Sequence, residues 1–265
     1  MKKTYIGLTC LLILSLALFV ALSFYGDALE RWHIKTGSFA RVLIGDTTHR
    51  RRTPSSATDS TRAVSQAPGQ DFSQTVDTAR KSILFIGDSM LEGLGPRLAA
   101  YAEENGHTLV NVIWYSSTTE VWGRTEKLKE YIAEYQPDYI FVSLGGNELF
   151  VSNIRDRRQK YLDNMLSQIG DIPFVWIGPP NWKPDTGINE MLAETLRPGQ
   201  FYLSYTPDQH YDRARDGAHP TRASASAWMD RVCAWVMKSA AHRIVLHRPK
   251  AARATCHTVV LAPAK

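Results

Sequence analysis

The sequence predicts an α/β protein with a mainly parallel, doubly wound sheet. From Lys81 onward, short apolar runs alternate with longer segments in which apolar residues recur every three or four positions. Glycine, proline or polar residues close these stretches, as they commonly do at the ends of strands and helices. Strands that alternate with helices in this way are typical of a parallel sheet with helices on its faces.

Four apolar runs are the expected strands, because they are rich in isoleucine, valine and aromatic residues. In chain order they are SILFIG (82–87), TLVNVIWY (108–115), YIFVSLG (139–145) and FVWIGP (174–179). In parallel sheets of this kind, functional residues gather at the carboxyl ends of the strands. We therefore expect the chemistry to lie in the residues that follow these runs.

Helical periodicity fills the intervals between the strands. The expected helices cover residues 90–106, 125–137 and 155–170, with a last one around residues 223–239. The domain is expected at residues 79–242. The remaining basic tail, residues 243–265, contains IVLH and HTVVL and suggests an added hairpin.

The N-terminal 26 residues have a different character. Residues 5–25 carry no charge and are long enough for a bilayer-spanning helix. A cleaved signal peptide is the competing interpretation, but its apolar region is normally about 7 to 15 residues long. We favour an uncleaved transmembrane anchor. Lys2 and Lys3 predict a cytoplasmic N-terminus, which puts the rest of the chain in the periplasm or outside the cell.

Two segments connect this predicted anchor to the domain. Residues 27–46 contain scattered apolar residues and are interpreted as a juxtamembrane piece. Residues 47–78 are rich in Ser, Thr, Arg and Pro without apolar periodicity, which is typical of a flexible linker.

Charge and cysteine content restrict the classes of function. The net charge is +5, and much of the excess lies in residues 50–52 and in the tail, with no interleaved aromatic residues. Such stretches near a bilayer more often meet anionic lipid or stay solvated, so we expect no nucleic-acid partner. Cys233 and Cys256 could pair in an oxidising compartment, whereas a buried free thiol at Cys233 is the alternative.

The stretch FIGDSML (85–91) places Ser89 between an expected strand and an expected helix. There its hydroxyl would lie near free backbone N–H groups and the positive end of a helix dipole, which suits a nucleophile. A helix cap is the simpler interpretation of the same serine. The motif DGAHPT (216–221) favours the nucleophile, because His219 can serve as a base and Asp216, three positions earlier, can orient its ring.

The motif GGNE (145–148) supplies a fourth role. Two glycines allow close approach of the backbone, and the Asn147 amide can donate to a developing oxyanion. An ordinary turn after a strand is the alternative for each of these residues.

Ser89 in GDS, Asn147 in GGNE and Asp216 with His219 in DGAHP resemble the ordered blocks of the SGNH, or GDSL, hydrolase superfamily. The resemblance covers residues 81–239. It implies a flavodoxin-like three-layer α/β/α sandwich that hydrolyses esters, with Ser89 as nucleophile, His219 as base and Asp216 as its orienting acid. It also implies an oxyanion hole that includes Asn147 and the N–H of Ser89.

Two positions depart from the family pattern. The glycine expected after the second strand is replaced by Ser116 or Ser117, so Ser116, together with Gly146, is assigned to the oxyanion hole by its backbone alone. Glu148 stands where the family commonly has Asp. Among the aromatic residues near these blocks, Trp182 and Trp114 are candidates for substrate binding, although core packing is the ordinary role of such rings.

The resemblance, together with the predicted anchor, points to an O-acetylesterase acting on cell-envelope or extracellular polysaccharide, which needs neither metal nor organic cofactor. The expected partners are an O-acylated carbohydrate, the membrane and a membrane-bound acyltransferase. An O-acetyltransferase with the same triad, a lipid esterase or thioesterase, and a non-catalytic glycan-binding module are the alternatives.

Overall fold

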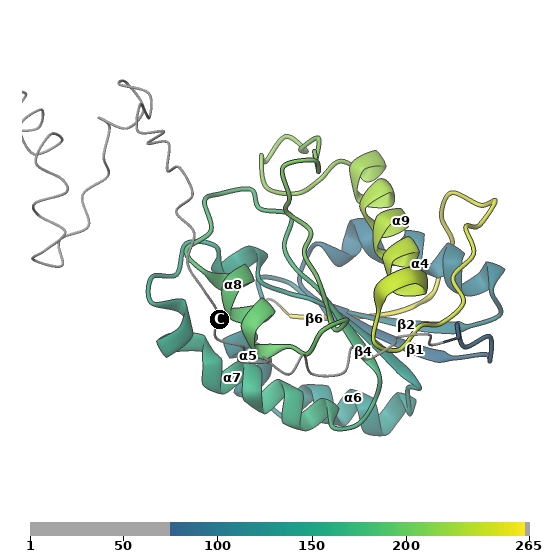
Figure 1. Cartoon of the computed structure of the whole chain (residues 1–265), viewed down its shortest axis with the longest axis horizontal. Coiled ribbons are helices and arrows are strands. Elements are labelled where there is room, and N and C mark those ends of the chain that lie inside the picture. Colours follow the sequence, from purple (N-terminus) through teal and green to yellow (C-terminus); the bar gives the residue numbers. More distant parts are fainter. Residues whose placement is uncertain (1–74, 263–265) are drawn as a thin grey trace, which may run out of the picture. The chain divides into compact units, whose positions relative to one another are not determined.

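The computed structural model describes residues 75–262, and these form one α/β unit around a six-stranded sheet (Figure 1). Every neighbouring pair of strands is parallel. The spatial order is β5-β4-β3-β1-β2-β6. The strands are β1 (Ser82–Gly87), β2 (Thr108–Trp114), β3 (Tyr139–Ser143), β4 (Phe174–Ile177), β5 (Phe201–Tyr202) and β6 (His257–Leu261). Without β6 this is the flavodoxin-like order 2-1-3-4-5, and the predicted parallel α/β class is confirmed.

Helices cover both faces of the sheet. Figure 1 shows α4 and α9 on one side and α6 and α7 on the other. Their bounds are α4 (Leu91–Glu104), α5 (Thr119–Gly123), α6 (Lys127–Tyr135), α7 (Ile154–Ile169), α8 (Ile188–Thr195) and α9 (Arg222–Ser239), with a short 3₁₀ helix, η2 (Gly146–Glu148).

The sheet separates two apolar cores because successive side chains of a strand point to opposite faces. In β1, Ile83 and Phe85 pack into the core under α4 and α9. Leu84 and Ile86 pack into the core under the helices of the other face. All four side chains are almost fully buried. Continuous apolar runs were therefore the correct signal for strands that are covered on both faces.

The prediction of a C-terminal hairpin is wrong. HTVVL forms β6, which extends the sheet in parallel beside β2, with Val112 opposite Val259. Ile244, in the IVLH run, instead makes an isolated parallel bridge to Asp77. The sheet thus continues past the boundary expected at residue 242. Val259 and Leu261 pack against the second core, and this burial explains the apolar character of the run.

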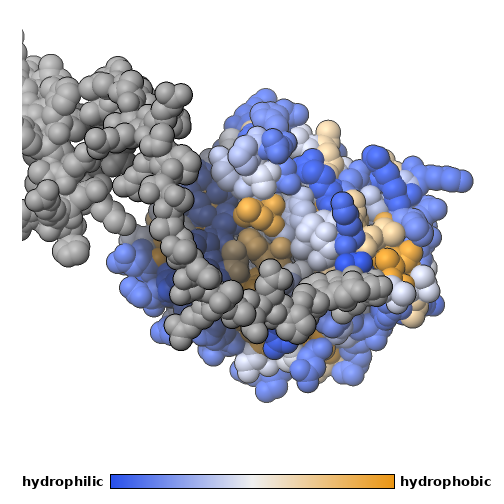
Figure 2. Space-filling model, in the orientation of Figure 1, coloured by the Kyte–Doolittle hydropathy of each residue, from blue (hydrophilic) through white to orange (hydrophobic). Residues whose placement is uncertain are grey.

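The predicted anchor, the juxtamembrane piece and nearly all of the predicted linker lie outside the described residues. No helix of residues 75–262 is both long and apolar enough to cross a bilayer. In the described part Cys233 and Cys256 are both free thiols, and Cys233 is buried, so they do not form a disulfide. The face drawn in Figure 2 is mostly hydrophilic, with small apolar patches.

Candidate active site

Ser89 lies in the tight turn that joins β1 to α4. The turn closes against β3: the backbone N–H of Asp88 donates to the carbonyl of Ser143, at 3.4 Å. A Cβ atom at Gly87 would come within 2.3 Å of that same carbonyl oxygen, so only glycine fits there. The sequence Gly-Asp-Ser therefore places the serine hydroxyl at the carboxyl edge of the sheet.

The structure brings the three predicted triad residues together. His219 Nε2 lies 2.7 Å from Ser89 Oγ. On the other side of the ring, His219 Nδ1 lies 2.7 Å from Asp216 Oδ2. Hydroxyl, imidazole and carboxylate thus form one chain of two short hydrogen bonds, which is the arrangement of a serine hydrolase triad.

Asp216 is held as a carboxylate by its own loop. Its Oδ1 accepts the backbone N–H groups of His219, at 3.0 Å, and Ala218, at 2.9 Å. The hydrogen bonds from the His219 backbone and ring and from Ala218 lower the pKa of Asp216 to about 2. A carboxylate at Oδ2 selects the tautomer with a proton on Nδ1, which leaves Nε2 free to accept the serine proton.

Arg213 anchors the loop that carries the histidine, a role that the sequence did not reveal. Its Nη1 donates to the carbonyl of Ala218 at 2.8 Å. Its Nη2 donates to the carbonyls of Pro180 at 2.6 Å and Asn181 at 2.9 Å, in the loop after β4. One guanidinium therefore ties the histidine loop to the neighbouring edge of the sheet. An arginine in a loop gives no sequence signal that distinguishes such a clamp from a solvated charge.

Of the residues assigned to the oxyanion hole, Ser89 and Ser116 line the cleft beside the triad, whereas Gly146 and Asn147 do not. Ser116 has a φ of 59°, a left-handed conformation that favours glycine. Within residues 75–262, the backbone N–H groups of Ser89 and Ser116 donate to no other group of the chain. Ser89 and Ser116 line one cleft, and neither N–H group is used elsewhere in the described part of the chain. Gly146 contributes its carbonyl to the indole Nε1 of Trp182, at 2.9 Å.

Asn147 is close to this site, but its amide already has partners. Its Nδ2 donates to Asp88 Oδ2 at 3.2 Å and to the carbonyl of Ser117 at 3.0 Å. Each of its two protons thus has an acceptor in the protein. To serve an oxyanion, the amide must share or exchange one of these bonds as the substrate binds.

Asp88 is a buried acid beside the nucleophile for which we predicted no role. Its side chain is 1% exposed, and its Oδ1 accepts the backbone N–H of Met90 at 2.9 Å. Burial raises the pKa of Asp88 to about 7. The sequence showed only an acid in the Gly-Asp-Ser turn, because its burial depends on the contact of that turn with Ser143 of β3.

Glu148 fastens the Asn147 turn to the loop that carries Ser116. The glutamate is fully buried and accepts the backbone N–H of Thr119 at 2.9 Å and its hydroxyl at 2.8 Å. Arg158 Nε donates to the same carboxylate at 2.7 Å, and its Nη1 pairs with Glu120 at 2.7 Å. The carboxylate of Glu148 thus contacts α5 and α7 together.

The cleft beside the triad has a volume of about 740 Å³. Its walls include Tyr115 and Glu92, whose side chains are hydrogen bonded to each other, and Arg253 from the C-terminal segment. Neither predicted aromatic residue lines it. Trp114 packs edge-on against Trp122, with ring centroids 5.2 Å apart, and belongs to the second core. Trp182 lines a separate surface hollow behind the Gly146 turn.

Among residues 75–262, no three His, Cys, Asp or Glu side chains are grouped so that they could hold a metal ion. The polar groups of the site instead form hydrogen bonds with one another, as described above. The arrangement can activate a hydroxyl, accept its proton and stabilise an oxyanion.

Comparison with known proteins gives structural neighbours alone. No family model and no curated protein matches the sequence. The fold is similar to that of the psychrotrophic esterase EstA from Pseudoalteromonas sp., with 17% identity, a TM-score of 0.45 and coverage of 59% of this chain and 97% of that one. It is also similar to TesA, with 19% identity, a TM-score of 0.45 and coverage of 59% and 98%. The functional argument therefore rests on the geometry of this chain.

Proposed function

We propose that the protein is a serine ester hydrolase of the SGNH type, acting as an O-acetylesterase on cell-envelope or extracellular polysaccharide. The observation that carries this proposal is the pair of 2.7 Å contacts that joins Ser89, His219 and Asp216. A serine that only caps a helix does not require contact with an imidazole. A histidine that is only a surface residue does not require contact with the serine in the turn after β1. Their contact across the fold supports catalysis over a binding role.

In the first half of the reaction Ser89 Oγ attacks the acetyl carbonyl carbon as His219 Nε2 takes the hydroxyl proton. The carbonyl π electrons move to oxygen and form an oxyanion, to which the unused N–H groups of Ser89 and Ser116 would donate. The oxyanion then re-forms the carbonyl and expels the sugar oxygen, which takes the proton from His219. The products of this half are an acetyl-serine and a free sugar hydroxyl.

In the second half, water gives a proton to His219 Nε2 and its oxygen attacks the acetyl carbon. Collapse of the second tetrahedral intermediate breaks the bond to Ser89 Oγ, which recovers the proton from His219, and acetic acid leaves. Asp216 remains ionised throughout and stabilises the imidazolium that forms in each half.

Two features support a small acyl group on a polar carrier. The catalytic cleft is open to solvent and lined by charged and polar side chains, among them Glu92, Arg222 and Arg253. The predicted N-terminal anchor would hold the domain near the cell envelope, where such carriers occur.

The test uses the full chain in detergent with p-nitrophenyl acetate, p-nitrophenyl decanoate and an O-acetylated oligosaccharide. We expect acetate release from both acetyl esters and slower hydrolysis of the decanoate. Preference for the decanoate would indicate a lipid esterase. Acetyl transfer to an added oligosaccharide in place of release into water would indicate a transferase. No turnover of any ester, with no labelling of Ser89 by a fluorophosphonate, would overturn the proposal.

A further inference from the structure

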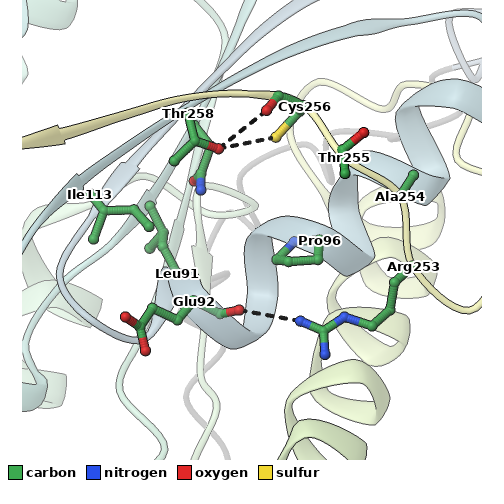
Figure 3. Close-up of a pocket in the computed structure, with 10 residues that line it drawn as sticks. Leu91, Glu92, Pro96, Ile113, Arg253, Ala254, Thr255, Cys256 and Thr258 are labelled. Atoms are coloured by element: carbon green, nitrogen blue, oxygen red, sulfur yellow. Dashed lines mark hydrogen bonds between the residues drawn. The ribbon is translucent and has the colours of Figure 1, made fainter.

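A second cleft, here called the side cleft, lies next to the catalytic cleft between α4, β2 and the C-terminal segment (residues 243–262). Its volume is about 510 Å³. Figure 3 shows Ile113 of β2 beside Leu91 of α4 on one side and Ala254 of the C-terminal segment on the other, with Pro96 of α4 between them. These side chains make most of the cleft apolar.

The walls of the side cleft are fixed in place. The backbone N–H of Ala254 donates to the carbonyl of Pro96 at 2.9 Å. The buried Arg97 uses Nη1 to hold the carbonyls of Ala251 and Ala252, at 2.7 and 3.0 Å. Its Nε pairs with Asp230 at 2.6 Å. The C-terminal segment is thus held on α4 by a buried arginine, in addition to the pairing of β6 with β2.

A buried amide lies at the base of this apolar cleft. Asn111 occupies the middle of β2, between Phe85 of β1 and Thr258 of β6 in the strand register. Asn111 lines the side cleft and is only 2% exposed, and its Oδ1 is closed to solvent and has no hydrogen-bond partner among the described residues. A Cβ atom at Gly95 would lie 2.7 Å from Asn111 Nδ2, so the glycine makes room for the amide. Burial of an unpaired polar atom destabilises a fold, and an apolar residue in place of Asn111 would avoid that loss of stability.

The side cleft and the catalytic cleft meet at Glu92 and Arg253, which line both. Figure 3 shows Arg253 at this junction, with Nη2 directed at the carbonyl of Glu92, 3.4 Å away. Ser89 lies three residues before Glu92, in the turn that precedes α4. A ligand in the side cleft can therefore belong to the same molecule whose ester bond is attacked.

The apolar walls and the unpaired amide oxygen of the side cleft favour one class of ligand. A plain acyl chain would suit the apolar walls but would leave Asn111 Oδ1 unpaired. A sugar hydroxyl could form a hydrogen bond with the amide, but the remaining polar groups of the sugar ring would then face the apolar walls of the cleft. An acetamido group meets both demands, because its methyl group is apolar and its N–H can donate to the Asn111 carboxamide oxygen once that side chain turns toward the cleft.

We propose that the side cleft binds the acetamido group of an N-acetylated amino sugar, so that the polysaccharide substrate contains such sugars. This inference rests on the proposed function for its link to catalysis, but binding in the side cleft can be measured without any reaction. The substrate class thus narrows from O-acetylated polysaccharide in general to an O-acetylated chain with N-acetylated residues.

The test is a calorimetric titration of the full chain with N,N′-diacetylchitobiose and with cellobiose, which lacks the acetamido groups. We expect the first to bind at least about tenfold more tightly. Asn111→Leu should abolish this difference. Asn164→Leu, the same substitution on α7 outside both clefts, should preserve it. Ala254→Phe fills the side cleft without altering the amide and should also abolish the difference.

Equal affinity for the two sugars, no binding of diacetylchitobiose to the folded wild-type chain, or an unchanged difference in both Asn111→Leu and Ala254→Phe would overturn the inference. These outcomes are separate from failure of the proposed function. Selective binding with no hydrolysis of any acetyl ester would retain the side cleft as a sugar site and reject the esterase. Hydrolysis of an acetyl ester together with equal affinity for the two sugars would retain the esterase and reject the sugar site.

Discussion

His219 Nε2 lies 2.7 Å from Ser89 Oγ, although 130 positions separate the two residues in the chain. The serine belongs to the turn after β1 and the histidine to the loop before α9. Because β1 lies near the centre of the sheet and α9 packs beside α4, these two loops meet at the carboxyl edge. The contact follows from the parallel topology, and the proposed catalysis depends on it.

Replacement of the nucleophile is the most direct check of this contact. Ser89→Ala should lower kcat for p-nitrophenyl acetate by at least about 1,000-fold, because no acyl-serine can form. The far-ultraviolet circular dichroism spectrum should not change. Ser167→Ala, a serine on α7, should keep wild-type kcat. Comparable turnover in Ser89→Ala and wild type would show that the contact is not catalytic.

Asp216 should affect kcat because it orients the ring of His219. Asp216→Asn should lower kcat by about 10,000-fold, because an amide at this place favours the wrong imidazole tautomer. Asp212→Asn, four positions earlier and exposed, is the matched control. If both variants retain activity, Asp216 does not orient the base.

The same carboxylate gives a pH signature in stability. The pKa of Asp216 is lowered to about 2 in the folded state, below its ordinary value of 3.8, so the folded protein binds this proton less readily than the unfolded chain. Its contribution to stability is present above pH 4 and is lost as the pH falls toward 2. The difference in melting temperature between wild type and Asp216→Asn should therefore shrink over this interval.

Asp88 should show the opposite dependence. Burial raises the pKa of Asp88 from 3.8 to about 7, so the folded state holds this proton more tightly than the unfolded chain. Ionisation of the buried acid therefore destabilises the fold progressively between pH 4 and pH 7, by at most about 4 kcal/mol. Chemical denaturation of Asp88→Asn should lack this decline, whereas Asp171→Asn in an exposed loop should retain it. Parallel pH profiles for wild type and Asp88→Asn would contradict the buried acid.

Asn147 tests the oxyanion hole. Asn147→Ala should lower kcat about 100- to 1,000-fold with little change in KM, because the lost hydrogen bond would act on the transition state. Steady-state kinetics with p-nitrophenyl acetate give both constants. Asn164→Ala serves as the matched control. A loss confined to KM would assign Asn147 to ground-state binding, and its contacts with Asp88 and Ser117 would then be structural.

The sequence by itself determined the four strands β1 to β4, the four longest helices and the three residues that meet as Ser89, His219 and Asp216. Apolar runs such as 82–87 and 139–145 identify buried strands because both faces of a parallel strand are covered. Gly-Asp-Ser specifies a tight turn, and Asp-Gly-Ala-His specifies a contact between two side chains three positions apart. Both are local features, so a short motif is enough to predict them.

Only the tertiary structure decided where the C-terminal run pairs, which acid is buried and where the two tryptophans lie. The placement of β6 beside β2 depends on which sheet edge is open, and no property of HTVVL specifies that edge. The burial of Asp88 depends on the contact of its turn with Ser143, and the clamp by Arg213 depends on two loops that meet in space. Burial and long-range hydrogen bonds arise from neighbours distant in the chain, so they exist only after the chain has folded.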